Sequence, residues 1–310
     1  MRLVADIGGT NTRIAFVPPG STTPEGARSF RNAGFDGFED VISEFLFHEV
    51  AQIGELIVAM AGPVAGNCGR LTNLDWVIDG QTLSQRFGGI AVRVINDLTA
   101  LGHAALKLTP HQLVPVVENP VHGSLQRQAL VVGIGTGFNV SPTVEAVGHI
   151  LCPAVEAGHT SLYASIEAEL DRLKPGLAQN FPTVEALFSG RGRRNFLSLL
   201  TGETVESATP YIANHGKTEN APFDAALDYY ATLIGMLLAE LKIAYLPTSG
   251  IFLAGGVARS SLTGERSHLC SEAAMRENTC IQISPPVWLI DDDAAALTGC
   301  ASIEVLAHPA

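Results

Sequence analysis

The apolar positions in the first hundred residues fall into short runs separated by glycine-rich or polar turns. Residues 3–7 (Leu-Val-Ala-Asp-Ile) and 13–17 (Arg-Ile-Ala-Phe-Val) flank a Gly-Gly turn, and this pattern predicts a β-hairpin. Residues 55–61 and 91–95 are further runs of strand length, whereas residues 37–50 carry apolar side chains at helical spacing. Strands that alternate with helical stretches are typical of an α/β fold.

The same pattern returns in the second half of the chain. Residues 129–132 are an apolar run that leads into a Gly/Thr-rich turn at 135–137, much as residues 4–7 lead into Gly8-Gly9-Thr10. This weak internal repeat predicts two domains of related architecture, each contributing one hairpin loop. Residues 108–128 contain three prolines and predict an irregular connection between the two domains.

The remaining apolar segments predict helices and two more strands. Helical spacing is found in residues 160–174, 183–200 and 222–245, and strand-like runs in residues 250–254 and 286–290. The run Asp291-Asp292-Asp293 precedes an alanine-rich stretch, so we expect it to form the acidic first turn of a final helix.

Composition narrows the class of protein. The chain has 310 residues, of which 46% are hydrophobic and 16% charged, as expected for a globular protein of about two domains. The net charge of −12 argues against nucleic acid or an anionic membrane as a partner, but it allows a small anionic ligand at a local site. The five cysteines lack metal-ligand spacing, and no signal-peptide pattern is present, so we expect a cytoplasmic protein.

The first candidate site is the loop after the first strand, residues 6–11 (Asp-Ile-Gly-Gly-Thr-Asn). Glycines allow successive backbone N–H groups to point at one anion, and threonine and asparagine add side-chain donors. Asp6 could face a hydrated Mg²⁺. An ordinary tight hairpin is the alternative. Glycine turns at 135–137 and 255–256 also end apolar runs, and three such loops favour a nucleotide site.

The second candidate is Asn96-Asp97, which follows the strand at 91–95 and precedes a helical stretch at 98–106. Ligands of α/β folds bind at such strand ends, and Asp97 could accept a proton from a substrate hydroxyl. A helix N-cap is the alternative, and the two roles can coexist.

The third group consists of Glu156, His159 and Glu185. A carboxylate accepts two hydroxyl hydrogen bonds, and an imidazole can donate one and accept another, which suits a vicinal polyol. The alternatives are an exposed helix position for Glu185 and a structural role for His159. Asn73 is a further polar candidate in a loop.

Taken together, these motifs resemble those of bacterial ATP-dependent glucokinases. Their order and spacing match that family over nearly the whole chain, in the segments Asp6-Ile7-Gly8-Gly9-Thr10-Asn11, Ile95-Asn96-Asp97, Gly135-Thr136-Gly137, Glu156-x-Gly158-His159, Glu185-x₃-Ser189-Gly190-x-Gly192 and Ala254-Gly255-Gly256. The resemblance implies a two-domain, actin-like (ribonuclease H-like) α/β fold. A small domain, residues 1–109 with 292–310, and a large domain, residues 110–291, would close over a ligand cleft.

The resemblance also implies a role for each motif. Asp97 would be the catalytic base, and Asp6 would orient Mg²⁺ through water. The glucose hydroxyls would be held by Asn96, Asp97, Glu156, His159 and Glu185, with Asn73 as the further loop candidate. ATP would be held by Asp6, Gly8, Gly9, Thr10, Asn11, Gly135, Thr136, Gly137, Gly255 and Gly256. The implied reaction transfers the γ-phosphate of ATP to the 6-hydroxyl of glucose, giving glucose 6-phosphate and ADP.

Two alternatives stay open. The polyol residues are equally compatible with a kinase for another hexose, such as fructose, mannose or an amino sugar. A non-catalytic sugar sensor is the other alternative, although Asp97 and both threonine-containing glycine loops are present and the acidic charge opposes DNA binding. The resemblance further implies a homodimer.

Overall fold

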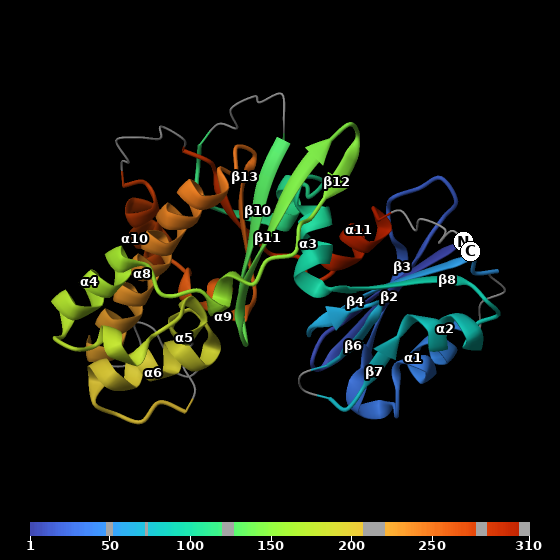
Figure 1. The fold of residues 1–310 in the computed structure, drawn as a ribbon, viewed down its shortest axis with the longest axis horizontal. Helices are drawn as coiled ribbons and strands as arrows, with labels where there is room; N and C mark the ends of the chain where they lie inside the picture. Colours follow the sequence, from blue (N-terminus) through green and yellow to red (C-terminus); the bar gives the residue numbers. More distant parts are fainter. Residues whose placement is uncertain (48–51, 72–73, 120–126, 207–220, 277–283, 304–310) are drawn as a thin grey trace. The chain divides into compact units, whose positions relative to one another are not determined.

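The chain folds into two compact α/β units. The computed structural model describes residues 1–47, 52–71, 74–119, 127–206, 221–276 and 284–303. Unit 1 comprises Met1–Thr109 and Asp292–Ala310, and unit 2 comprises Pro110–Asp291. Each unit is built around its own mixed sheet (Figure 1).

The unit 1 sheet begins with the predicted hairpin. Its strand order is β3-β2-β1-β4-β8, with β1 antiparallel to β2 and parallel to β4. The strands are β1 (Arg2–Ile7), β2 (Asn11–Val17), β3 (Glu25–Arg31), β4 (Glu55–Met60) and β8 (Ala91–Asn96). A separate small sheet contains β5 (Val64–Ala65), β6 (Cys68–Arg70) and β7 (Val77–Asp79). The strands predicted at 3–7, 13–17, 55–61 and 91–95 are therefore confirmed.

Helices cover both faces of the unit 1 sheet. On one face, apolar side chains of α1 (Phe38–Leu46) and α2 (Gly80–Arg86) pack against the strands. On the other face, α3 (Asp97–Ala105) and α11 (Ala295–Ala301) bury alanine, leucine and Cys300 against β1 and β4. The backbones of α3 and α11 approach closely, since a Cβ at Gly299 would collide with the carbonyl of Ala100.

The unit 2 sheet repeats the topology of unit 1. Its order is β12-β11-β10-β13-β14-β9, with an antiparallel β10/β11 hairpin and β13 parallel to β10. The strands are β9 (Leu113–Val117), β10 (Arg127–Ile134), β11 (Phe138–Ala146), β12 (His149–Leu151), β13 (Gly250–Ala254) and β14 (Val287–Ile290). Five strands match those of unit 1 in order and direction, as the weak sequence repeat predicts.

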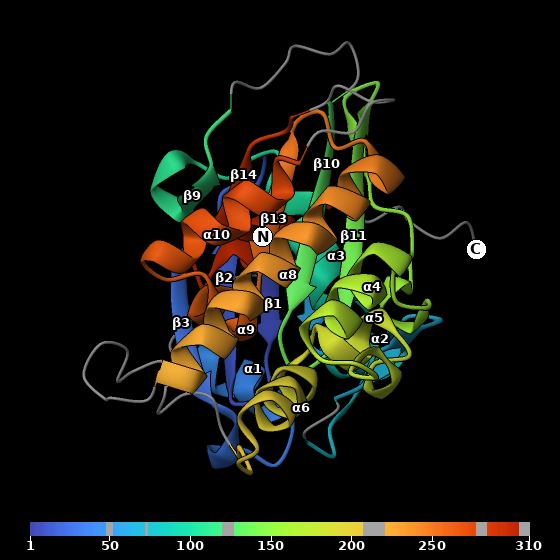
Figure 2. The ribbon, with the colours of Figure 1, turned by 90° about the vertical axis from the view of Figure 1, so that its left-hand side faces the viewer.

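The helices of unit 2 enclose a large apolar core around α8 (Ala221–Tyr245). Figures 1 and 2 both show α8 lying along one face of the sheet, and its buried Leu, Ile and Tyr side chains belong to the same core as β10 and β13. The other helices are α4 (Ala164–Leu173), α5 (Val184–Leu187), α6 (Gly190–Thr201), α9 (Gly256–Ser261) and α10 (Glu265–Ala274). Short 3₁₀ turns are η1 (Asn32–Gly34), η2 (Pro110–Gln112), η3 (Ala157–His159) and η4 (Ala178–Asn180).

Two sequence predictions were wrong. The region 108–128 is not wholly irregular, because it contains β9, which pairs with β14. β9 is the edge strand of the sheet, and an edge strand need not donate every N–H, so Pro115 is tolerated there. The acidic run 291–293 does not form the first turn of a helix, because α11 begins only at Ala295. Asp293 instead pairs with Arg13, and Asp292 accepts the backbone N–H of Ala294.

None of the helices in the described ranges combines the length and the apolar character that a bilayer span requires.

Candidate functional site

In unit 1, the loop predicted to bind phosphate connects β1 to β2. The Gly8 N–H donates to the Asn11 carbonyl at 3.0 Å, which closes the turn. Gly9 and Thr10 are exposed at its tip, whereas Gly8 and Asn11 are half-buried. The tip of the loop is therefore open to solvent, so that an anion could reach it.

The buried side chain of Asn32, which the sequence did not single out, stabilises this loop. The Asn32 side chain, 2% exposed, accepts from the Thr12 hydroxyl at 2.8 Å and donates to the Gly8 carbonyl at 2.8 Å. Its backbone N–H donates to the Thr10 carbonyl at 2.9 Å. Nothing in the sequence marks Asn32, because its partners come from another turn some twenty residues away.

Asp6 lies at the end of β1, next to a charged network. Arg13 on β2 places one guanidinium nitrogen 3.7 Å from the Asp6 carboxylate and another 3.2 Å from Asp293. Burial, together with the negative charge of Asp97, raises the pKa of Asp6 to about 7, although Arg13 opposes the shift. Arg13 thus compensates only part of the negative charge that gathers at this end of the sheet.

Asn96 and Asp97 lie where β8 ends and α3 begins. The Asn96 side chain caps α3 by accepting from Leu98 N–H at 2.9 Å, and its amide donates to the Gly62 carbonyl at 3.0 Å. One Asp97 oxygen accepts from the same Leu98 N–H at 2.8 Å. Burial raises the pKa of Asp97 to about 6, against the lowering effect of these hydrogen bonds. The predicted N-cap is real, but the Asn96 side chain supplies it, and Asp97 shares the same Leu98 N–H.

In unit 2, three glycine-containing turns converge. The first is the β10/β11 turn, closed by Gly135 N–H donating to the Gly137 carbonyl at 2.9 Å, with Thr136 exposed. Gly190, which opens α6, donates its N–H to the Gly135 carbonyl at 2.8 Å. Gly255, between β13 and α9, has a φ of +97°, and a Cβ there would collide with the carbonyl of Ile134. Only glycine fits this approach without strain.

Glu185 is held against the first of these turns. It lies on α5, and its carboxylate accepts from the Phe138 N–H at 3.0 Å. A Cβ at Gly137 would lie 2.7 Å from the same carboxylate oxygen, so glycine leaves room for the glutamate. Glu185 is half-buried. It is therefore not a fully exposed helix position, which was the alternative interpretation.

Glu156 and His159 lie together on the segment that contains η3. Both side chains are exposed. The intervening Gly158 is buried, and a Cβ there would collide with the Phe138 carbonyl and lie 3.3 Å from the Glu185 Cβ. The segment is thereby packed against β11 and against Glu185. Three side chains suited to polyol hydroxyls, those of Glu156, His159 and Glu185, are thus gathered in one unit.

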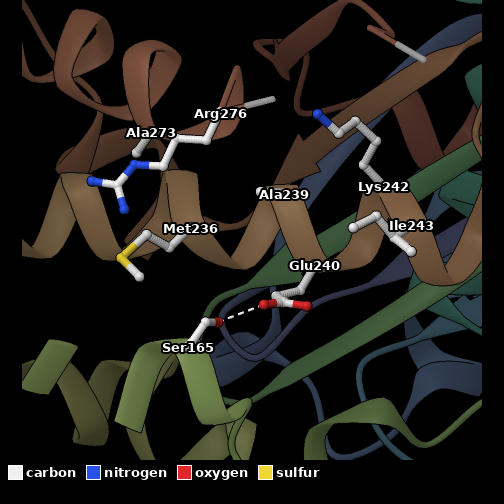
Figure 3. Close-up of a pocket in the computed structure, with 8 residues that line it drawn as sticks. All are labelled: Ser165, Met236, Ala239, Glu240, Lys242, Ile243, Ala273 and Arg276. Atoms are coloured by element: carbon white, nitrogen blue, oxygen red, sulfur yellow. Dashed lines mark hydrogen bonds between the residues drawn. The ribbon is translucent and has the colours of Figure 1, made fainter. Parts of the chain in front are cut away.

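Several features lie apart from these groups. Asn73 falls outside the described residues. Figure 3 shows a cavity between α4, α8 and the end of α10, with a volume of about 170 Å³. Ser165 and Glu240 are hydrogen-bonded to each other in its wall. None of the predicted site residues lines this cavity. Within the described ranges, no three His, Cys, Asp or Glu side chains are grouped as a metal site.

Comparisons with known proteins agree with the family resemblance. A family model described as glucokinase matches residues 3–306. A glucokinase from Caulobacter vibrioides is 30% identical, over 83% of this chain and 80% of its own. The crystal structure of a glucokinase from an Antarctic psychrotroph is 26% identical, with a TM-score of 0.79 and 97% of both chains covered. A ROK family glucokinase from Streptomyces griseus, solved with glucose and AMPPNP, is 17% identical, with a TM-score of 0.61 over 97% of both chains, and shares the fold.

Proposed function

The chain belongs to the glucokinase family of ATP-dependent hexose kinases, and from this premise we propose how its residues phosphorylate glucose. Asp97 acts as the base for the sugar 6-hydroxyl, the polar residues of unit 2 hold the other hydroxyls, and the glycine turns hold ATP. The observation that carries the proposal is the position of Asp97 at the junction of β8 and α3, at the same end of the sheet as Asp6.

Asp97 is suited to accept a proton late in the reaction. Phosphoryl transfer has a loose transition state, so positioning matters more than early removal of the proton. With a pKa of about 6, the Asp97 carboxylate is ionised at neutral pH and is a stronger base than an ordinary aspartate. Its hydrogen bond with the Leu98 N–H fixes one oxygen and leaves the other for the 6-hydroxyl.

We expect the sugar hydroxyls to be bound by two carboxylates and one imidazole. Glu156, Glu185 and His159 offer two carboxylates and a ring that can donate or accept, and the Asn96 amide has a second N–H besides the one given to Gly62. Sites that hydrogen-bond each hydroxyl reject analogues that lack one, because a buried partner is then left unpaired. Deoxy sugars are therefore expected to be poor substrates.

ATP is bound mainly by backbone groups. The tips of the Gly8-Gly9-Thr10-Asn11 and Gly135-Thr136-Gly137 turns offer N–H groups and threonine hydroxyls to the phosphates. Gly255 follows β13 and Gly256 opens α9, and the flat adenine ring of ATP can approach the backbone at these two glycines without meeting a side chain. This mode of binding needs few basic residues, in keeping with a net charge of −12.

Mg²⁺ fits the donor set around Asp6. Mg²⁺ is usually bound by one or two carboxylates together with substrate phosphates and water. Asp6, close enough to Asp97 to feel its charge and only partly neutralised by Arg13, offers such a carboxylate. Bound there with ATP, the ion would neutralise charge on the phosphate oxygens.

A coupled assay of ADP release over a panel of hexoses tests the proposal. We expect turnover with glucose, ATP and Mg²⁺, and little without Mg²⁺. Turnover only with another hexose would replace glucose as the substrate, and no turnover with any hexose would favour a sugar sensor. The homodimer rests on the family resemblance, and analytical ultracentrifugation tests it. The cytoplasmic location rests on the cysteine usage and on the lack of a signal-peptide pattern.

A further inference from the structure

Asn139, the second residue of β11, uses both ends of its side-chain amide. The nitrogen donates to the Val155 carbonyl at 2.7 Å and to the Glu156 carboxylate at 3.2 Å. The oxygen accepts from the N–H groups of Val140 at 2.8 Å and Ala157 at 3.0 Å. One half-buried side chain therefore joins the strand to three successive residues of the segment that carries Glu156.

The Glu156 side chain depends on this contact. Glu156 is exposed, and its side chain makes no capping bond to η3, which it precedes. Among the described residues, its carboxylate accepts no hydrogen bond other than the one from Asn139. Without that bond, the glutamate is free to sample several rotamers, and sugar binding would have to overcome the entropy of ordering it.

We infer that Asn139 is a positioning residue for sugar binding, which holds the Glu156 carboxylate toward the hexose hydroxyls. This inference rests on the proposed function, because it takes Glu156 as a sugar ligand. The neighbouring Phe138 N–H holds Glu185 in the same way, so the first two residues of β11 fix both carboxylates. Of these two anchors, only Asn139 acts through its side chain and can be removed by substitution.

The first test compares Asn139→Ala with Asn180→Ala. Asn180, on η4 of the same unit, also donates a side-chain hydrogen bond to a backbone carbonyl, that of Leu177 at 3.0 Å, and it belongs to none of the site groups. We expect Asn139→Ala to raise the KM for glucose about tenfold, with kcat and the KM for ATP changed less than about threefold. Asn180→Ala should leave all three unchanged.

A double-mutant cycle separates positioning from general damage to the fold. In a Glu156→Gln background, Asn139→Ala should raise the glucose KM by much less than in the wild type, because the positioned carboxylate is already gone. A structural defect would instead raise the KM by the same factor in both backgrounds. That result, or an unchanged glucose KM in a folded Asn139→Ala protein, would overturn the inference.

Asn139→Asp keeps the test open if the alanine variant does not fold. It preserves the shape and the two acceptor bonds, but it sets a carboxylate oxygen against Glu156. We expect a rise in glucose KM at least as large as that of Asn139→Ala, and a smaller rise in the Glu156→Gln background, where the glutamine amide can donate to the new carboxylate. An equal rise in both backgrounds would contradict the inference, whereas a wild-type protein inactive on every hexose would instead refute the proposed function.

Discussion

The negative charge of Asp97 raises the pKa of Asp6, although Asp6 lies on β1 and Asp97 directly follows β8, another strand of the unit 1 sheet. β4 lies between those strands, and both groups are placed at the same end of the sheet because β1, β4 and β8 are parallel. Two carboxyl groups that lie close together in partly buried positions cannot both ionise without a cost in free energy. This relationship governs how the stability of the protein should depend on pH.

The first prediction concerns stability against pH in the absence of ATP and Mg²⁺. The folded pKa values of Asp97 and Asp6, about 6 and about 7, lie above the ordinary value of 3.8. The folded state thus binds more protons than the unfolded chain, so this contribution to stability is present below pH 4 and is lost as pH rises toward 7. Asp97→Asn should raise the free energy of unfolding at pH 7.5 by about 1–2 kcal/mol and flatten its pH dependence.

Urea unfolding of the wild type and of Asp97→Asn at about pH 4 and about pH 7.5 measures this difference. The two proteins should differ little at the lower pH and clearly at the higher pH. A variant that is less stable than the wild type at the higher pH would contradict the assigned shift.

The second prediction concerns catalysis by Asp97. Asp97→Ala should lower kcat by about 10²–10⁴, the usual contribution of a positioned base. The wild-type kcat/KM should rise with pH through a limb near pH 6, because only the ionised carboxylate accepts the proton. Asp36→Ala, at an exposed aspartate of the same unit, serves as the matched control. Near wild-type turnover by Asp97→Ala would rule Asp97 out as the base.

The third prediction uses two adjacent glycines. Gly255 combines a φ of +97° with close contact to the Ile134 carbonyl, whereas a Cβ at Gly256 would meet no atom within 4 Å. Gly255→Ala should therefore lower the free energy of unfolding by about 2 kcal/mol or more, and Gly256→Ala should not lower it. Thermal unfolding without ligands compares the two. Equal effects would show that the close approach of the turns is not required.

The fourth prediction concerns the brace of the first glycine loop. Asn32→Ala leaves the Thr12 hydroxyl and the Gly8 carbonyl without their buried partner, which should cost about 1–3 kcal/mol of stability. Because the loop tip then loses its support, the KM for ATP should rise more than the KM for glucose. Steady-state kinetics with each substrate varied in turn provides the measurement, and an unchanged KM for ATP would show that the loop does not need the brace.

The sequence predicted best what local pattern determines. The β1/β2 hairpin, the strands that end at Asn96 and Ala254, and the glycine turns all follow from apolar runs that meet glycine or polar residues. The family motifs then drew attention to Glu156 and Glu185, whose surroundings the structure describes.

Contacts between distant segments could not be predicted in this way. Asn32 and Asn139 are important because of partners that the fold brings to them, and neither has a local signature. Arg193 stands in the basic segment Gly190-Arg191-Gly192-Arg193-Arg194, and so many charges close together would by themselves indicate a solvated turn. It is instead buried, and it joins α6 to α9 through the hydroxyls of Ser260 and Ser261. The length of a charged run says nothing about which member the fold will bury.

The return of α11 to unit 1 bears on how the protein is made. The face of the sheet that carries Val4 and Ile57 is covered by residues 295–301, which leave the ribosome only after all of unit 2 has been synthesised. Unit 2 is continuous in sequence and can complete its core first, while the apolar face of the unit 1 sheet still lacks α11. Unit 1, most of which is synthesised first, therefore completes its fold last. Until α11 packs against it, the uncovered apolar face of the unit 1 sheet is the surface that most needs protection by a chaperone.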